Sequence, residues 1–150
     1  MKKVIKAVKV RTDGQRASFV PFHDSEWEVI YKKGEKAYPP EYCPGSKLMA
    51  FATLEDAEIH AAVEEWDCEI WLAETTRAEC IFEVSNIYYG AEAFDFWKLY
   101  PNYWGRIKYL YEAPKGSLAC DDITLIERIG YVYDREFFFD NEFDNNLLQS

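Results

Sequence analysis

The sequence predicts an α+β fold, in which one globular domain over residues 1–150 holds a largely antiparallel sheet of about seven strands and one or two helices. Three observations lead to this prediction. Short runs of alternating apolar and polar residues recur, turn-forming residues separate them, and one stretch keeps a clear helical spacing of apolar residues. The composition agrees, because 49% of the residues are hydrophobic and 29% are charged. A chain of this length can bury roughly 70% of its unfolded surface.

The first elements are predicted to be strands. Residues 4–11 carry apolar side chains on both sides, which indicates a strand with both faces partly covered. An Asp-Gly pair at 13–14 favours a hairpin turn into a second strand at 16–22. Pro21 restricts that strand to the edge of the sheet or ends it early, because proline donates no ladder hydrogen bond. Strict alternation of apolar and charged residues over 26–32 predicts a half-buried strand.

A loop, a buried strand and a helix are expected next. Glycine and proline residues over 33–45 indicate a loop with a fixed, extended path. The short apolar run at 48–52 predicts a buried strand. A helix is expected over 54–66, and it begins after Thr53 with Asp56 three residues on, as in a capping box.

The second half of the chain is predicted to add strands and a short helix. Strands at 70–73 and 80–84 are expected to form a second hairpin, and further strands are expected at 107–112 and 123–129. A helix over 91–99 is expected to stop before Pro101, because the residue before a proline avoids the helical conformation. Residues 131–150 are expected to form a last strand or an arm.

Charge patterning argues against one class of partner. Residues 1–50 hold ten Lys/Arg against six Asp/Glu, and residues 51–150 hold seven against twenty-one, so the two parts carry +4 and −14 and sum to −10. A general binder of nucleic acid polymers is disfavoured, because each neutralised phosphate needs a basic residue. The basic exception is the first predicted strand, whose lysines are more commonly used to protect an edge strand against aggregation. Its basic residues are Lys2, Lys3, Lys6, Lys9 and Arg11.

The sequence contains no motif that predicts a membrane span, a metal site or a cofactor site. No apolar run approaches the roughly 20 residues that span a bilayer, so a cytoplasmic protein is expected. The four cysteines lack paired spacing, which favours reduced thiols over a disulfide framework or a zinc site. His60 lies four residues from Asp56 and Glu64, a pattern more typical of a solvated helix face than of a metal site. The glycines never cluster into a phosphate loop, so no cofactor and no catalytic residue is predicted.

Aromatic residues concentrate between 88 and 104, and this cluster is the predicted ligand site. Arg106 follows it directly, and an arginine beside exposed aromatic rings can hold a base by stacking and a phosphate by paired hydrogen bonds. The alternative is that the rings belong to the core and that Arg106 lies along a strand. The predicted ligand-binding residues are Tyr88, Tyr89, Trp97, Tyr103, Trp104 and Arg106.

The end of the chain supplies a candidate contact surface. Four phenylalanines stand among five acids and one arginine between 134 and 144. Three consecutive phenylalanines in so polar a setting are expected to cover a core edge, a second copy of the chain, or a basic partner. The predicted partner-binding residues are Phe137, Phe138, Phe139 and Phe143.

Two resemblances add expectations. The chain looks like a group of small bacterial and phage proteins of unsettled function. The resemblance rests on the order of Tyr31-Lys-Lys-Gly34, Pro39-Pro40, the run 51–57, the strand 69–72, Pro114-Lys-Gly116-Ser and Ile123-Thr-Leu. The segment 51–62 is also similar to part of the ADP-ribosyltransferase-like folds. The chain lacks the H-G or R-S opening motif, the S-T-S strand and the Q/E-x-E turn that carry NAD binding and catalysis in that superfamily.

The favoured hypothesis is therefore a non-enzymatic, phage-associated binding protein that captures a small nucleotide-like ligand or masks a partner protein. The first alternative is a divergent NAD-consuming ADP-ribosyltransferase-like enzyme. The second is an acidic decoy that captures a basic nucleic-acid-binding protein. A homo-oligomer is compatible with the aromatic clusters.

Overall fold

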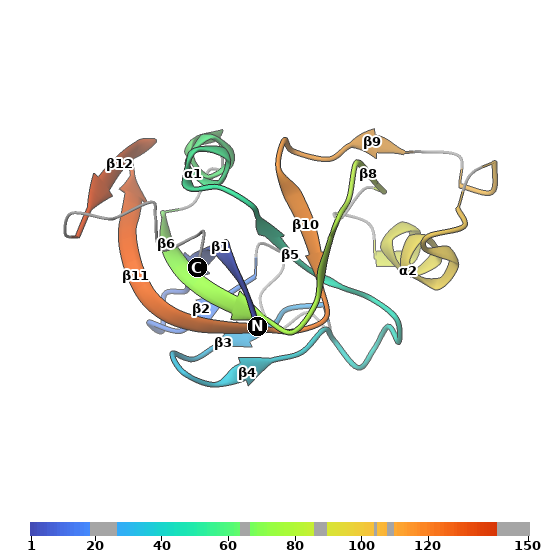
Figure 1. The fold of residues 1–150 in the computed structure, drawn as a ribbon, viewed down its shortest axis with the longest axis horizontal. Coiled ribbons are helices and arrows are strands. Elements are labelled where there is room, and N and C mark those ends of the chain that lie inside the picture. The colour runs from blue at the N-terminus through green and yellow to red at the C-terminus, as the bar shows by residue number, and fades with distance from the viewer. Residues whose placement is uncertain (19–26, 64–66, 86–89, 104, 108–109, 141–150) are drawn as a thin grey trace.

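The fold is taken from a computed structural model that describes residues 1–18, 27–63, 67–85, 90–103, 105–107 and 110–140. Within these ranges the chain forms two helices and a large antiparallel sheet, which confirms the α+β class (Figure 1). The strands are β1 (Lys2–Val10), β2 (Arg16–Ala17), β3 (Ile30–Tyr31), β4 (Lys36–Ala37), β5 (Leu48–Phe51), β6 (Cys68–Thr75), β7 (Ala78–Cys80), β8 (Glu83–Val84), β9 (Tyr111–Glu112), β10 (Ser117–Cys120), β11 (Ile123–Tyr133) and β12 (Glu136–Phe139). The helices are α1 (Leu54–Val63) and α2 (Gly90–Leu99).

The main sheet has the strand order β12-β11-β6-β1-β5-β10-β7. Strand β2 pairs with β1 and β3, and β4 pairs with the start of β11. The sheet has ten strands in the described part of the chain, not about seven, because β4 lies in the segment expected to be a loop and β10 was not predicted as a strand. Strands β8 and β9 pair separately beside α2, at the right of Figure 1.

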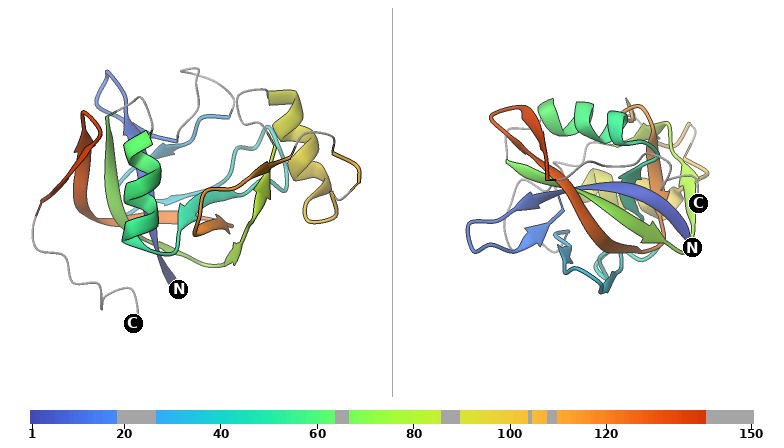
Figure 2. Two further views of the ribbon diagram at one scale, coloured as in Figure 1. Left: turned by 90° about the horizontal axis from the view of Figure 1, so that it is seen from above. Right: turned by 60° about the vertical axis from the view of Figure 1, so that its left-hand side comes forward.

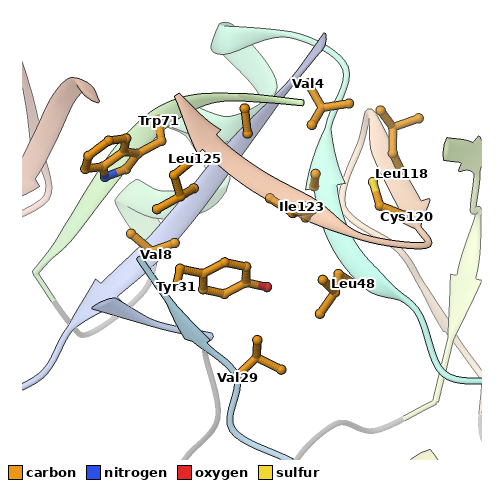
Figure 3. Close-up of a cluster of buried hydrophobic side chains, with 12 residues drawn as sticks. Val4, Val8, Val29, Tyr31, Leu48, Trp71, Leu118, Cys120, Ile123 and Leu125 are labelled. Atoms are coloured by element: carbon orange, nitrogen blue, oxygen red, sulfur yellow. The ribbon is translucent and has the colours of Figure 1, made fainter. Parts of the chain in front are cut away.

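Two clusters of apolar side chains cover the two faces of the central strands. Figure 2 shows α1 on one side of β1, β6 and β11 and the β3–β4 segment on the other. The cluster beneath α1 includes Ile5, Ala57, Ala61 and Ile70. The opposite cluster includes Val4, Val8, Tyr31, Trp71 and Leu125 (Figure 3). Alternate residues of β1 and β6 thus enter different clusters, as expected for a strand covered on both faces.

Strand β11 serves both clusters because it is irregular. Its pairing with β6 shifts register between Leu125 and Glu127 and again between Arg128 and Gly130. Its first half contributes to the cluster with Tyr31, and its second half contributes Ile129 to the cluster beneath α1. Bulges of this kind bend a strand and redirect its side chains.

Several sequence predictions are confirmed by the structure. The first hairpin is present, with Lys9 opposite Ala17 and with Gly14 at a φ of 85°. The cap at the start of α1 is present, because the backbone N–H of Asp56 donates to Thr53 Oγ1 at 3.2 Å. Helix α2 ends at Leu99, before Pro101, as expected. Residues 131–139 form the end of β11 and all of β12, so this part is a strand pair and not an arm.

Two predictions are wrong. Strands β6 and β7 do not form a hairpin, because β6 lies between β1 and β11 while β7 pairs with β10. The stretch of β6 is apolar on both faces and therefore belongs in the middle of the sheet. The lysines of β1 do not protect an edge either, because β1 lies between β6 and β5. Lys6 is 6% exposed and Lys9 is 3% exposed.

Candidate functional site

The candidate site begins with a divergence of two strands from one edge of β1. The opposite edge of β1 is paired with β6 from Lys2 to Lys9. On the edge that β6 does not cover, β5 pairs only through Ile5 opposite Phe51, and β2 pairs through Lys9 and Val10. Residues 6–8 therefore have no paired strand on this edge within the described ranges. The sheet opens at this point.

A cavity of about 230 Å³ occupies the opening. It lies where the clusters on the two faces of the sheet meet a third cluster formed around α2. Its wall is mainly apolar and aromatic, and no Asp or Glu among the described residues lines it. The apolar wall consists of Ala7, Trp27, Val29, Tyr31, Pro40, Leu48, Met49, Phe51, Val84, Trp97 and Pro114.

Lys6 is the central polar group of the wall. Its Nζ donates to the Met49 carbonyl oxygen at 2.6 Å and lies 5.2 Å from the centre of the Tyr31 ring. Burial lowers the pKa of Lys6 from 10.5 to about 8, and the nearby Cys120 offsets part of that effect. Lys6 is therefore still mostly protonated at neutral pH, in a cavity whose described wall offers it no carboxylate.

Two hydroxyls on the wall are buried and lack a hydrogen-bond partner among the described residues. Tyr31 is 2% exposed and Ser46 is 5% exposed, and neither Tyr31 Oη nor Ser46 Oγ is bonded. Figure 3 shows the Tyr31 ring among Val8, Val29 and Leu48, with its hydroxyl directed to the side of Leu48. Burial also raises the pKa of Tyr31 well above its ordinary value, so it keeps its proton. An unsatisfied buried hydroxyl costs about 1–3 kcal/mol, so a ligand that bonds to both would recover that cost.

Other polar side chains of the wall already have partners. Lys47 Nζ bonds Asp121 Oδ1 at 2.5 Å, Ser117 Oγ donates to the Pro114 carbonyl, and Ser18 Oγ accepts from the backbone of Val29. Burial, followed by the charge of Lys6, lowers the pKa of His60, which favours a neutral imidazole there. The free hydrogen-bonding capacity therefore centres on Lys6, Tyr31 and Ser46.

The structure separates the predicted ligand-binding residues. Trp97 lies on the cavity wall, whereas Tyr103 is buried in the third cluster, 4.9 Å from Phe96 between ring centres. Arg106 is exposed and does not line the cavity. Tyr88, Tyr89 and Trp104 lie outside the described residues.

The predicted partner-binding residues lie at one edge of the sheet. Phe137 is half-buried and packs against the cluster beneath α1, whereas Phe138 and Phe139 are 39% and 55% exposed. Phe143 lies outside the described ranges.

Sequence reasoning missed Lys6, Tyr31, Ser46 and Trp27. One signal was present: Lys6 stands between Val4 and Val8 at a spacing of two, so in a strand it shares their face. A lysine on a core face indicates a special environment, because buried lysines are rare. The sequence gives no such signal for the hydroxyls of Tyr31 and Ser46, because whether they find a hydrogen-bond partner depends on residues far away in the sequence.

The described residues contain no group of three or more His, Cys, Asp or Glu side chains that could hold a metal ion. They also contain no helix long and apolar enough to cross a membrane. All four cysteines are free thiols, with Cys80 exposed and the others buried. Comparisons with protein-family models, curated proteins and solved structures find no match to this chain.

Proposed function

We propose that the chain is a binding protein for a small, planar molecule that carries hydrogen-bond acceptors or a negative charge. The observation that carries this proposal is the grouping of Lys6 with the unpartnered hydroxyls of Tyr31 and Ser46 on one cavity wall. A ligand acceptor bonded to the hydroxyls of Tyr31 and Ser46 would satisfy donors that the described protein leaves unbonded, and Lys6 Nζ has N–H groups besides the one it donates to Met49. Trp27 and Trp97 supply flat apolar surface for a ring.

The cavity volume limits the size of the ligand. A cavity of about 150 Å³ holds benzene, which corresponds to about 25 Å³ for each non-hydrogen atom. At that ratio, a volume of about 230 Å³ accommodates about nine such atoms. This size suits a pyrimidine base or a substituted benzene ring, so the proposed nucleotide-like ligand is limited to a base of that size or to a similar small ring compound.

Tryptophan fluorescence tests the proposal, because Trp27 and Trp97 lie on the wall. The protein is titrated with uracil, cytosine and benzoate, which lie within that size limit, and binding of at least one is expected to change the emission. Lys6→Met is expected to weaken binding at least tenfold, because a hydrogen bond to a charged group contributes about 1.5–3 kcal/mol. Lys2→Met, an exposed change on the same strand, is the matched control. Equal affinity for the two variants would contradict the assigned site.

A second candidate function is contact with another protein through β12. This strand ends the sheet order, and Phe138 and Phe139 are exposed on it. Exposed aromatic side chains on an edge strand favour an intermolecular contact. Native mass spectrometry tests the version with a second copy: the expected dimer is lost in Phe138→Ser/Phe139→Ser, and a monomeric parent protein would exclude it. The transferase and decoy hypotheses stay predictions.

A further inference from the structure

The chemistry of Lys6 extends beyond hydrogen bonding. Its side chain reaches from a central strand into an apolar cavity, and Nζ is held at the Met49 carbonyl oxygen. A lysine amine that is desolvated in an apolar pocket is an activated nucleophile toward carbonyl compounds. Lys6 therefore has the placement that a covalent capture of a carbonyl ligand needs.

We propose that Lys6 captures small aromatic aldehydes as an imine inside this cavity. The proposal rests on the proposed function, because it needs a cavity that admits a ligand. The neutral amine of Lys6 adds to the carbonyl carbon and forms a C–N bond, and the proton from nitrogen moves to the carbonyl oxygen. The resulting hydroxyl leaves as water after a second proton transfer from nitrogen, and a C=N bond remains. No oxidant or reductant is consumed.

The surroundings of Lys6 favour each part of this reaction. With a pKa of about 8, about a quarter of the Lys6 amines are neutral at pH 7.5. A lysine with the ordinary pKa of 10.5 has only about one neutral amine in a thousand at the same pH. Tyr31 Oη and Ser46 Oγ are hydroxyls with free capacity that can bond the carbonyl oxygen and relay its proton. Lys6 is only 6% exposed, and this burial limits contact of the imine with bulk water, which would hydrolyse it.

The cavity also selects the class of carbonyl compound. Benzaldehyde has eight non-hydrogen atoms, which is within the limit of about nine set by the volume. Its ring can lie against Trp27 or Trp97. Benzyl alcohol has the same size but lacks the electrophilic carbon, so it is the matched control compound.

Trapping with sodium cyanoborohydride tests the proposal on the full chain. Benzaldehyde is added near pH 8, the imine is reduced to a stable benzyl amine, and peptide mapping gives the labelling rate of each lysine. Lys6 is expected to be labelled at least tenfold faster than the exposed Lys2 and Lys33, and its rate is expected to rise with a midpoint near pH 8. Lys6→Met removes the fast label and serves as the negative control.

Labelling of Lys6 that is no faster than that of the exposed lysines would overturn the covalent step. A parallel fluorescence titration with benzyl alcohol and with the ligands named above then separates two cases. Persisting quenching shows that the cavity binds ligands without the covalent reaction, so only the covalent proposal fails. Absence of any quenching shows that the proposed function fails together with it.

Discussion

Replacing Lys6 with methionine is expected to remove a penalty on folding that depends on pH. The folded protein lowers the pKa of Lys6 from 10.5 to about 8, and each pKa unit corresponds to 1.36 kcal/mol. The product, about 3 kcal/mol, is the penalty that the charged form of Lys6 imposes on folding. Methionine has a similar length, suits the apolar wall and carries no charge.

The pH dependence has a definite sign. Between about pH 8 and about pH 10.5 the unfolded chain holds the Lys6 proton while the folded chain has released it, so the parent protein gains stability as the pH rises. The penalty is complete below about pH 8 and absent above about pH 10.5. The stability of Lys6→Met relative to the parent is therefore expected to fall by about 3 kcal/mol between pH 7 and pH 10.5. Loss of the bond from Lys6 Nζ to the Met49 carbonyl oxygen adds a cost of about 1–3 kcal/mol that does not depend on this titration.

Urea unfolding followed by tryptophan fluorescence measures this difference at several pH values. The difference between parent and variant isolates Lys6, because other groups titrate in both proteins. Lys2→Met, which changes an exposed residue of the same strand, is expected to shift stability by less than about 0.5 kcal/mol at every pH. A stability difference between the parent and Lys6→Met that does not change with pH would refute the reasoning.

Three other variants test further features, each by urea unfolding. Tyr31→Phe removes a buried, unbonded hydroxyl and is expected to leave stability unchanged or raise it by about 1 kcal/mol; a loss above 1 kcal/mol would show that the hydroxyl is bonded. Glu69→Gln weakens bonds from Arg16 and Arg128, with an expected loss of about 2–4 kcal/mol near pH 7. Burial would raise the pKa of Glu69, but these bonds outweigh burial and lower it. The loss of stability in Glu69→Gln should therefore vanish in acid, where the folded carboxylate of the parent is protonated. A loss of stability that does not change with pH would contradict this assignment. Gly130→Ala places a Cβ 2.2 Å from the Phe138 carbonyl oxygen, so a loss of stability of at least about 2 kcal/mol is expected. An unchanged free energy of unfolding would contradict this close approach.

Local signals account for the parts of the fold that were predicted from the sequence. The Asp-Gly pair at 13–14 and the Thr53 cap act within a few residues, so their turn and helix start were predicted correctly. The pairing of β6 with β1 and β11 is not local. Adjacent strands suggested a hairpin, but a strand that is apolar on both faces is more stable in the middle of the sheet.

The site was predictable only in part, for a related reason. Trp97 was proposed as an aromatic residue and lies on the cavity wall. The wall also needs Lys6 and Tyr31, which come together because β5 and β2 leave the same edge of β1. No short sequence pattern encodes a divergence between strands, so these residues could not be assigned before the topology was known.

The central place of β1 has a consequence for the order of events during synthesis. Strand β1 precedes all its partners in the chain, and β6, which pairs with it from Lys2 to Lys9, ends 65 residues after Val10. At a typical rate of about 5–20 residues each second, β1 waits roughly 3–13 s for that partner. During this time the edge of β1 that β6 later covers has no partner strand, although β2 and β5 of the opposite edge are already synthesised. Lys6 and Lys9 interrupt its apolar sequence, and they lower its tendency to aggregate before the sheet closes around it.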